Sequence, residues 1–318
     1  MLKRAIRKPV PKPVPGPMSS PVRSSLPRLV LANESLRAEI VPELGGALAR
    51  LDAIGAHGAQ PLLRPHAAHA DEHDPNLLAC YPLVPWSNRI GGGQFVFDGR
   101  TVEVPRTCAA ETLPIHGHGW RAPWQLIEQD QDLVSLSYSH EDGKPYRYRA
   151  QLDYRLSGEQ LSVTLALENL GATLPFGMGL HPFFPRNSRT RLYAPAQYWW
   201  ESGPDHLPVA QASLPVAVDF ATLRAMPDGV DHAFGGWAGL ARIDGGPFTP
   251  SVTLESDTDH YVLYTPAGQS FFCFEPVDHP INACNLPGEA RQHGLTVLSE
   301  GETLTRNFRF VVSARGAR

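Results

Sequence analysis

The feature that most constrains the fold of this chain is a strict alternation of apolar and polar residues between positions 146 and 167. Apolar side chains occupy every second position from Tyr146 to Leu156, with arginine, glutamine or aspartate between them. After Ser157-Gly158-Glu159 the alternation resumes from Leu161 to Leu167. Because the side chains of a strand point alternately to the two faces of its sheet, this pattern predicts a hairpin of about ten residues per arm.

Shorter strand-like runs continue along the rest of the chain, and helical periodicity is nearly absent. The one expected helix is short, with Asp219 as its N-cap, Met226 as its last residue and Pro227 ending it. Strands do not alternate with helices, and no repeat of roughly 20–50 residues occurs. The sequence therefore predicts an all-β fold, a large antiparallel β-sandwich whose two curved sheets leave a concave face. The other expected strands are 31–41, 95–104, 133–140, 251–255, 261–264, 271–275, 295–298 and 304–312.

Composition excludes several classes of function. The 318 residues include 28 Lys and Arg against 32 Asp and Glu, and this balance argues against a nucleic-acid surface. No apolar run approaches the roughly 20 residues that cross a bilayer, so we expect no membrane partner. The four cysteines form no C-x-x-C pair, which favours reduced core thiols and a cytoplasmic location. A small neutral ligand fits these properties best.

The chain is expected to divide into a tail, residues 1–27, and one domain, residues 28–318. The tail holds seven of the 31 prolines and six basic residues without an acid, so we expect it to be disordered. It lacks the apolar segment of a secretory signal. Met18 offers a second start, which makes residues 1–17 a candidate dispensable extension. Without the tail, 22 basic and 32 acidic residues remain, a net charge of −10.

Two short segments in the first half place polar side chains beside turns. Asn88-Arg89 precedes three glycines, which do not form a phosphate loop because no Gly-Lys-Ser/Thr ending or helix follows. In His116-Gly117-His118-Gly119-Trp120 the glycines let a ligand approach the backbone, and the Trp120 indole offers a flat face to a sugar ring. Structural explanations stay open, because the arginine could pair with a surface acid and the tryptophan could lie in the core.

The His-x-His pair of the second segment also raises the question of a metal-binding cupin barrel. A cupin places a glutamate a few residues after the second histidine, whereas 122–124 here read Ala-Pro-Trp. Imidazole is a common metal ligand, so His116 and His118 remain a minor metal-site alternative.

Three later segments each hold one titratable side chain in an apolar setting. His181 lies in Gly-Leu-His-Pro-Phe-Phe, Asp231 follows the Gly229 turn, and Glu275 ends the apolar run that begins at Phe271. A histidine in such surroundings is often a satisfied core residue, and Asp231 is weak evidence by itself. The carboxylate of Glu275 should be partly desolvated, which raises its pKa and makes it a better base near neutral pH.

Taken in chain order, these segments resemble the aldose 1-epimerase (galactose mutarotase) family, from about Leu31 to Val312. The family carries an early Asn-Arg pair, a His-Gly motif, a second histidine past the middle, an aspartate in Asp-His-x-Phe, and a glutamate at a late strand end. Each motif is short, and their shared order on an all-β chain carries the resemblance. The matching residues are Asn88-Arg89, His116-Gly117, His181, Asp231-His232-Ala233-Phe234 and Glu275.

The resemblance implies a galactose mutarotase-like supersandwich and an isomerase that interconverts the α and β anomers of an aldose. By this resemblance Glu275 is the general base and His181 the general acid. Substrate contacts would come from Arg89, His116, Asp231, Asn88, His118 and Trp120. The expected partner is a small monosaccharide, and the expected reaction needs neither a metal nor a redox cofactor. The sequence does not indicate an oligomeric state.

The sequence departs from the family pattern beside the acid and the base. Gly-Leu precedes His181 where galactose mutarotases have Thr-Asn, Pro-Val follows Glu275 in place of Thr-Gln, and His118 replaces a glycine. These changes concern the pocket wall, so they bear on which sugar binds more than on the type of reaction.

Two rival functions stay open at this point. The first is a hexose-6-phosphate or sulfosugar 1-epimerase using Arg89, Arg121 and Arg186, although the net charge of −10 suits an anionic substrate poorly. The second is a noncatalytic carbohydrate-binding β-sandwich.

Overall fold

The computed structural model describes residues 26–56, 58–67, 73–141, 144–246 and 249–313. The tail predicted over residues 1–27 therefore lies almost entirely outside the described residues. Leu26, its first described position, is partly buried against the apolar residues near the site described below.

Two large sheets form the body of the described chain, as predicted, and every pair of neighbouring strands in them is antiparallel. The first sheet has eleven strands in the order β1-β2-β3-β5-β13-β21-β20-β17-β15-β16, with β4 paired to β3. Its strands are β1 Leu29–Ala32, β2 Leu36–Val41, β3 Ala47–Gly55, β4 Gly58–Pro61, β5 Cys80–Leu83, β13 Gly179–Pro185, β15 Tyr198–Ser202, β16 Pro208–Ala212, β17 Asp231–Gly235, β20 His260–Tyr264 and β21 Phe271–Val277.

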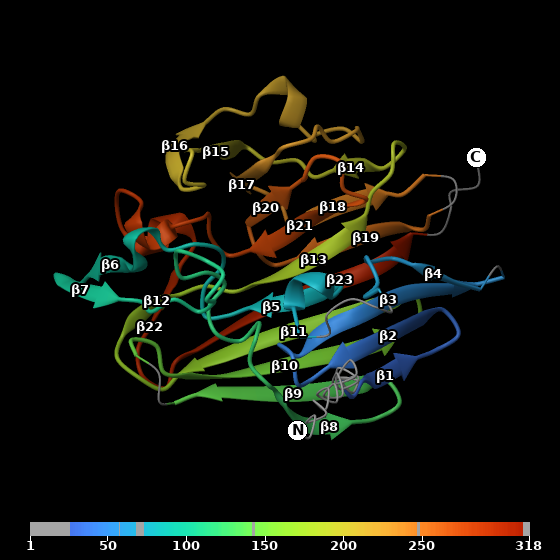
Figure 1. Cartoon of the computed structure of the whole chain (residues 1–318), viewed down its shortest axis with the longest axis horizontal. Helices are drawn as coiled ribbons and strands as arrows, with labels where there is room; N and C mark the ends of the chain where they lie inside the picture. Colours follow the sequence, from blue (N-terminus) through green and yellow to red (C-terminus); the bar gives the residue numbers. More distant parts are fainter. Residues whose placement is uncertain (1–25, 57, 68–72, 142–143, 247–248, 314–318) are drawn as a thin grey trace, which may run out of the picture.

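The second sheet has eight strands in the order β14-β18-β19-β23-β11-β10-β9-β8. Its strands are β8 Gln125–Gln129, β9 Leu133–His140, β10 Tyr148–Ser157, β11 Gln160–Asn169, β14 Arg191–Tyr193, β18 Leu240–Asp244, β19 Ser251–Ser256 and β23 Thr303–Ser313. In Figure 1 the blue strands of the first sheet lie across the green strands of the second.

Smaller elements extend from the sandwich. Two two-stranded ribbons are formed by β6 Gln94–Phe97 with β7 Arg100–Glu103 and by β12 Leu174–Phe176 with β22 Thr296–Leu298. Within the described ranges the helical turns are all of the 3₁₀ type: η1 Pro75–Leu77, η2 Gly91–Gly93, η3 Val216–Val218, η4 Ala283–Asn285 and η5 Ala290–His293. Among the described residues, no helix is long and apolar enough to cross a membrane.

The hairpin predicted from the alternation is confirmed. β10 and β11 have ten residues each, and Ser157 pairs with Gln160 across a two-residue turn. Along β10, buried positions alternate with exposed or half-buried ones. Three tyrosines on or just before this strand donate hydroxyl hydrogen bonds to backbone carbonyls outside the second sheet: Tyr146 to the Pro175 carbonyl, Tyr148 to that of Val84 and Tyr154 to that of Gly46.

Two apolar clusters lie on opposite faces of the eleven-stranded sheet. The larger one fills the space between the sheets and includes Leu180 and Phe274. Their strand neighbours Phe183 and Cys273 belong to the smaller cluster on the other face. Because strand side chains alternate, the odd positions of β13 and β21 face away from the main core. The same parity places position 181 and position 275 on this second face.

The helix expected from Asp219 to Met226 is wrong. The Asp219 carboxylate accepts from the backbone N–H of Ala221, which forms a local turn in place of a helical cap. Further on, Arg224 and Leu192 exchange two backbone hydrogen bonds, and Ala194 donates to the Phe220 carbonyl. The segment pairs with the region of β14, and these tertiary bonds replace the intrahelical ones.

Two expected strands are each divided by a turn. The run at 31–41 is split between β1 and β2, where the Asn33 side chain accepts from the backbone of Ser35 and Leu36. The run at 95–104 is the β6–β7 ribbon, turning at Asp98-Gly99, where both residues have positive φ. Asp-Gly is a strong two-residue turn signal, so the sequence already contained this information.

The alternation of β11 gives a direct test of the sandwich. Leu167 is 1% exposed within the core, so we expect Leu167→Ala to lower the free energy of unfolding by about 2–5 kcal/mol. Glu168 faces outward and pairs with Arg149, so Glu168→Ala should lower it by about 1 kcal/mol or less. Urea unfolding of both variants measures the difference. Equal losses would contradict the assigned faces.

Candidate active site

The site centres on His181 and Glu275, which lie on neighbouring strands at the middle of the eleven-stranded sheet. Gly179 pairs with Val277 and Phe183 with Cys273, so His181 on β13 and Glu275 on β21 face each other across the ladder. Figure 1 shows these two strands side by side. His181 Nε2 lies 3.2 Å from Glu275 Oε1. The two predicted catalytic residues can therefore contact the same small molecule.

Burial sets the charge state of this pair. His181 is 8% exposed and Glu275 is 2% exposed. Desolvation lowers the pKa of His181 to about 3 and raises the pKa of Glu275 well above its usual value. Burial therefore favours the neutral form of each group. In that form the Glu275 carboxyl can donate its proton to Nε2 of His181, and Glu275 Oε2 is buried without a hydrogen-bond partner among the described residues.

Aromatic rings hold the imidazole of His181 in place. Tyr81, its pairing partner on β5, stacks on it with ring centroids 4.6 Å apart. Phe183 stacks on it with centroids 4.7 Å apart. The Tyr81 hydroxyl donates to Oδ1 of Asn76, which anchors this ring from behind. The Nε2 atom of His181 is therefore fixed against the sheet.

The guanidinium group of Arg64 packs on the aromatic rings next to His181. The Arg64 side chain lies over the rings of Phe183 and Phe271, 3.9 and 4.5 Å from their centroids. It donates to the backbone carbonyls of Asn76 and Leu78. Its positive charge adds to the burial that lowers the pKa of His181. A single arginine in an irregular segment gave no sequence signal for this role.

His116 stands beside the pair as a neutral donor. Its ring centroid lies 5.3 Å from that of His181, nearly perpendicular to it. Its Nδ1 accepts from the backbone N–H of Asn88 at 3.2 Å, so in the neutral ring Nε2 carries the proton. Burial lowers the pKa of His116 well below its usual value, which keeps the ring neutral. Nε2–H is then available to a substrate oxygen.

The backbone around His116 requires unusual conformations. Gly117 has φ of 70°, and a Cβ there would lie 2.0 Å from the Val84 carbonyl oxygen, so only glycine fits. His116 and Asn88 have φ of 59° and 57°, the left-handed region that non-glycine residues rarely occupy. Strain of this kind is concentrated at functional sites.

Arg89 and Asp231 act on the pair through their charges. The Asn88 side chain accepts from the Arg89 backbone N–H, and Arg89 Nη2 lies 3.7 Å from a carboxylate oxygen of Glu111. Asp231, at the start of β17, lies 3.1 Å from Nδ1 of His206. The charge of Asp231 raises the pKa of Glu275, and that of Arg89 lowers it. Six predicted residues, Asn88, Arg89, His116, His181, Asp231 and Glu275, are thus brought to one region.

His118 and Trp120 are placed differently from the sequence expectation. The His118 ring stacks on His140 of β9, 3.8 Å between centroids. Positive φ at His116 and Gly117 interrupts the strand alternation that would put His116 and His118 on one face. The two histidines do not converge, so the cupin-type metal site is wrong. Trp120 is 2% exposed and packs against Tyr81 and His116. It therefore supports these two side chains and does not offer an exposed ring face to a sugar.

Sequence reasoning missed several neighbours of the pair. Tyr81 and Arg64 have the contacts given above, and Cys273 shares the face of Glu275 two positions earlier on β21. His206 comes from the turn between β15 and β16, a segment with no motif. The cysteine could have been found, because two residues on one strand at spacing two lie on one face.

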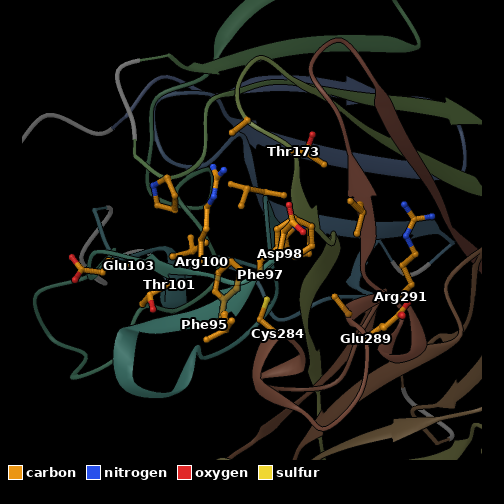
Figure 2. A pocket seen from close by; sticks show the side chains of 18 of the residues that line it. Phe95, Phe97, Asp98, Arg100, Thr101, Glu103, Thr173, Cys284, Glu289 and Arg291 are labelled. Carbon is orange, nitrogen blue, oxygen red and sulfur yellow. The ribbon is translucent and has the colours of Figure 1, made fainter.

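A large hollow of the described surface lies elsewhere. It has a volume of about 1180 Å³ and is formed by the β6–β7 ribbon, the β12–β22 ribbon and the η5 turn. Figure 2 shows its charged side chains, among them Asp98, Arg100 and Glu289, which are exposed. It contains no desolvated acid–base pair, so we do not place catalysis there.

Comparison with known proteins agrees with this fold. The chain is 34% identical over 257 residues to the uncharacterised protein YphB of Escherichia coli (strain K12), covering 77% of this chain and 86% of YphB. A crystal structure of a candidate aldose 1-epimerase from Escherichia coli K12 superposes with a TM-score of 0.83 at 29% identity, covering 90% of this chain and 99% of that one.

A more distant structure shares the fold alone. The galactose 1-epimerase from Lactobacillus acidophilus NCFM gives a TM-score of 0.73 at 17% identity, covering 90% of this chain and 94% of that one. Residues 27–311 match the profile of the family described as aldose 1-epimerase. This match spans most of the sequence and includes every residue of the site, so the chain belongs to the aldose 1-epimerase family.

Proposed function

We propose that this protein is an aldose 1-epimerase that interconverts the α and β anomers of a neutral aldose. The observation that carries the proposal is the buried contact between His181 and Glu275, 3.2 Å long, with His116, Arg89 and Asp231 around it. A noncatalytic sugar-binding domain gives no reason to bury an unpaired carboxyl oxygen beside an imidazole, since such an atom lowers stability.

The reaction requires one group to remove a proton and another to supply one. Glu275 takes the proton of the C1 hydroxyl while His181 gives a proton to the ring oxygen. The bond between C1 and the ring oxygen breaks, and C1 becomes an aldehyde carbon. Rotation about C1–C2 presents the other carbonyl face. Closure then returns the proton from Glu275 to the C1 oxygen, and His181 recovers its proton from the C5 hydroxyl.

One proton shared by the pair serves both halves of this cycle. Ring opening begins from carboxylate and imidazolium, and it ends with a neutral carboxyl and a neutral imidazole. The neutral state described above is therefore the one that holds the open-chain aldehyde. The two states differ only in the position of a proton across the 3.2 Å contact, so their ratio does not depend on pH. Each group acting as acid or base contributes a rate factor of roughly 10²–10⁴.

The charges around the pair support a neutral substrate. Arg89 has Glu111 beside it, and Asp231 adds a second carboxylate. Arg186 pairs with Asp228, and Arg121 lies over the ring of Trp120. Each of the three arginines that a phosphate or sulfonate pocket would enlist thus already has a partner.

Replacing the carboxyl of Glu275 tests catalysis directly. In Glu275→Gln the size of the side chain is retained and the proton acceptor is lost, so we expect the rate of anomer interconversion above background to fall by about 10²–10⁴. Polarimetry of freshly dissolved α-glucose and α-galactose measures this rate. Glu103→Gln, at an exposed position of β7, is the matched control. An unchanged rate in Glu275→Gln would exclude the assigned role.

The pH profile tests the electrostatic role of Asp231. Activity requires one proton on the pair, so it should be lost below the pKa of His181, about 3, and above the raised pKa of Glu275. Removing the Asp231 charge lowers the pKa of Glu275, so Asp231→Asn should move the alkaline limit of kcat to lower pH. Asp228→Asn, which changes a carboxylate paired with Arg186, should leave the limit in place. A shift to higher pH would contradict the assignment.

Substrate charge separates the two enzyme hypotheses. Because Asp231 and Glu111 would repel a dianion, kcat/KM for glucose 6-phosphate should be lower than for glucose by about tenfold or more. Anomeric exchange followed by NMR at equal ionic strength gives both values. A preference for the phosphorylated sugar would favour the hexose-6-phosphate alternative.

A further inference from the structure

Cys273 lies beside the catalytic pair and is not used by the reaction. It is fully buried on β21, two residues before Glu275 and on the same face of the sheet. Its Sγ, one ring nitrogen of His181 and one carboxylate oxygen of Glu275 all lie within 4.8 Å of one another. Residues 273 and 183 pair across the β13–β21 ladder, so the rigid centre of the sheet holds the three groups together.

These three groups form a recognised set of zinc ligands. Zinc binds thiolate sulfur at about 2.3 Å and imidazole nitrogen or carboxylate oxygen at about 2.0–2.2 Å, in tetrahedral geometry. Two nitrogen or oxygen ligands of one zinc ion therefore lie roughly 3.3 Å apart, and the contact between His181 Nε2 and Glu275 Oε1 is 3.2 Å. Cys273 Sγ lies within 4.8 Å of a ring nitrogen of His181 and a carboxylate oxygen of Glu275, so it must move closer to bind the same ion.

A second observation points to a ligand at this place. Glu275 Oε2 is buried and has no hydrogen-bond partner within the described part of the chain, although Glu275 is only 2% exposed. Such an atom is stabilised by anything that supplies positive charge or a donor. A zinc ion bound by thiolate and carboxylate has its two charges balanced, so the neighbouring Arg64 and Arg89 do not prevent binding.

We propose that His181, Cys273 and Glu275 form a zinc-binding site at which a thiophilic divalent metal inhibits the enzyme. Three protein ligands leave the fourth position of the tetrahedron for water. The inhibition rests on the proposed function, whereas the metal site does not. Metal binding releases the shared proton and the Cys273 thiol proton to solvent and occupies the lone pairs of Nε2 and the carboxylate, so proton transfer stops. Sugar and metal need the same two side chains, so inhibition is competitive.

Cobalt(II) serves as the spectroscopic probe for zinc. Purified full-length protein titrated with Co²⁺ should develop the intense near-ultraviolet absorption of a cobalt–thiolate bond, and equimolar Zn²⁺ should abolish it. Cys273→Ser should lack the band. Cys284→Ser, a cysteine outside the site, should keep it. Absence of the band from the unaltered protein, or its persistence in Cys273→Ser, would overturn the metal site.

Inhibition is measured separately by polarimetry, with each variant compared to its own rate in chelator. Zinc should raise the apparent KM of the unaltered protein for its sugar and leave kcat unchanged. Cys273→Ser should need at least about tenfold more zinc for half-inhibition, since losing even an outer-shell partner weakens binding this much. A cobalt–thiolate band without inhibition would overturn the inhibitory role. If no variant has activity above background, the proposed function fails, and the cobalt band still decides the metal site.

Discussion

The arrangement of this protein depends on one contact, in which a carboxyl and an imidazole meet inside a sheet where water is excluded. A charged Glu275 or His181 would lose most of its hydration there, so the stable form of the pair is neutral. The pair therefore retains one proton over a wide range of pH. The same exclusion of water lowers the proton affinity of His181 and raises that of Glu275, which favours giving a proton from His181 and accepting one at Glu275 during ring opening. Burial of a carboxylate without a charged partner ordinarily lowers the stability of a fold. In this protein the same burial is the source of the proposed chemistry.

A buried polar network behind the pair holds the site together. His279 Nε2 accepts from the backbone N–H of Ser87, next to Asn88. Asp278 accepts from the backbone N–H of Met178 and pairs with Arg306 of β23. Burial lowers the pKa of His279 to about 4, so the ring stays neutral and can accept. His279 thereby fixes the segment that leads into Asn88 and Arg89, and Asp278 fixes Met178, the residue before β13. The ion pair between Asp278 and Arg306 links this region to the second sheet.

Short motifs differ in how well they specify position. His181 and Glu275 lie on strands, where alternation fixes the direction of each side chain once the buried face is known. His118 follows two residues with positive φ, so the alternation of a strand does not predict the direction of its side chain. Its ring stacks on His140 of β9. The Asp219–Met226 segment shows the same limit in secondary structure, since its local helical signal is weaker than the backbone bonds it makes with the region of β14. Loops and short segments are decided by what surrounds them.

The sequence by itself determined the all-β class, the β10–β11 hairpin and the residues that carry the family resemblance. These depend on periodicity and residue type, which are local properties. Only the tertiary structure decided which side chains meet. Strand order places β13 beside β21 although about ninety residues separate them, and that pairing joins His181, Glu275 and Cys273. Arg64, Tyr81 and His206 reach the same region from unrelated segments, because long-range packing is not encoded in any short stretch of sequence.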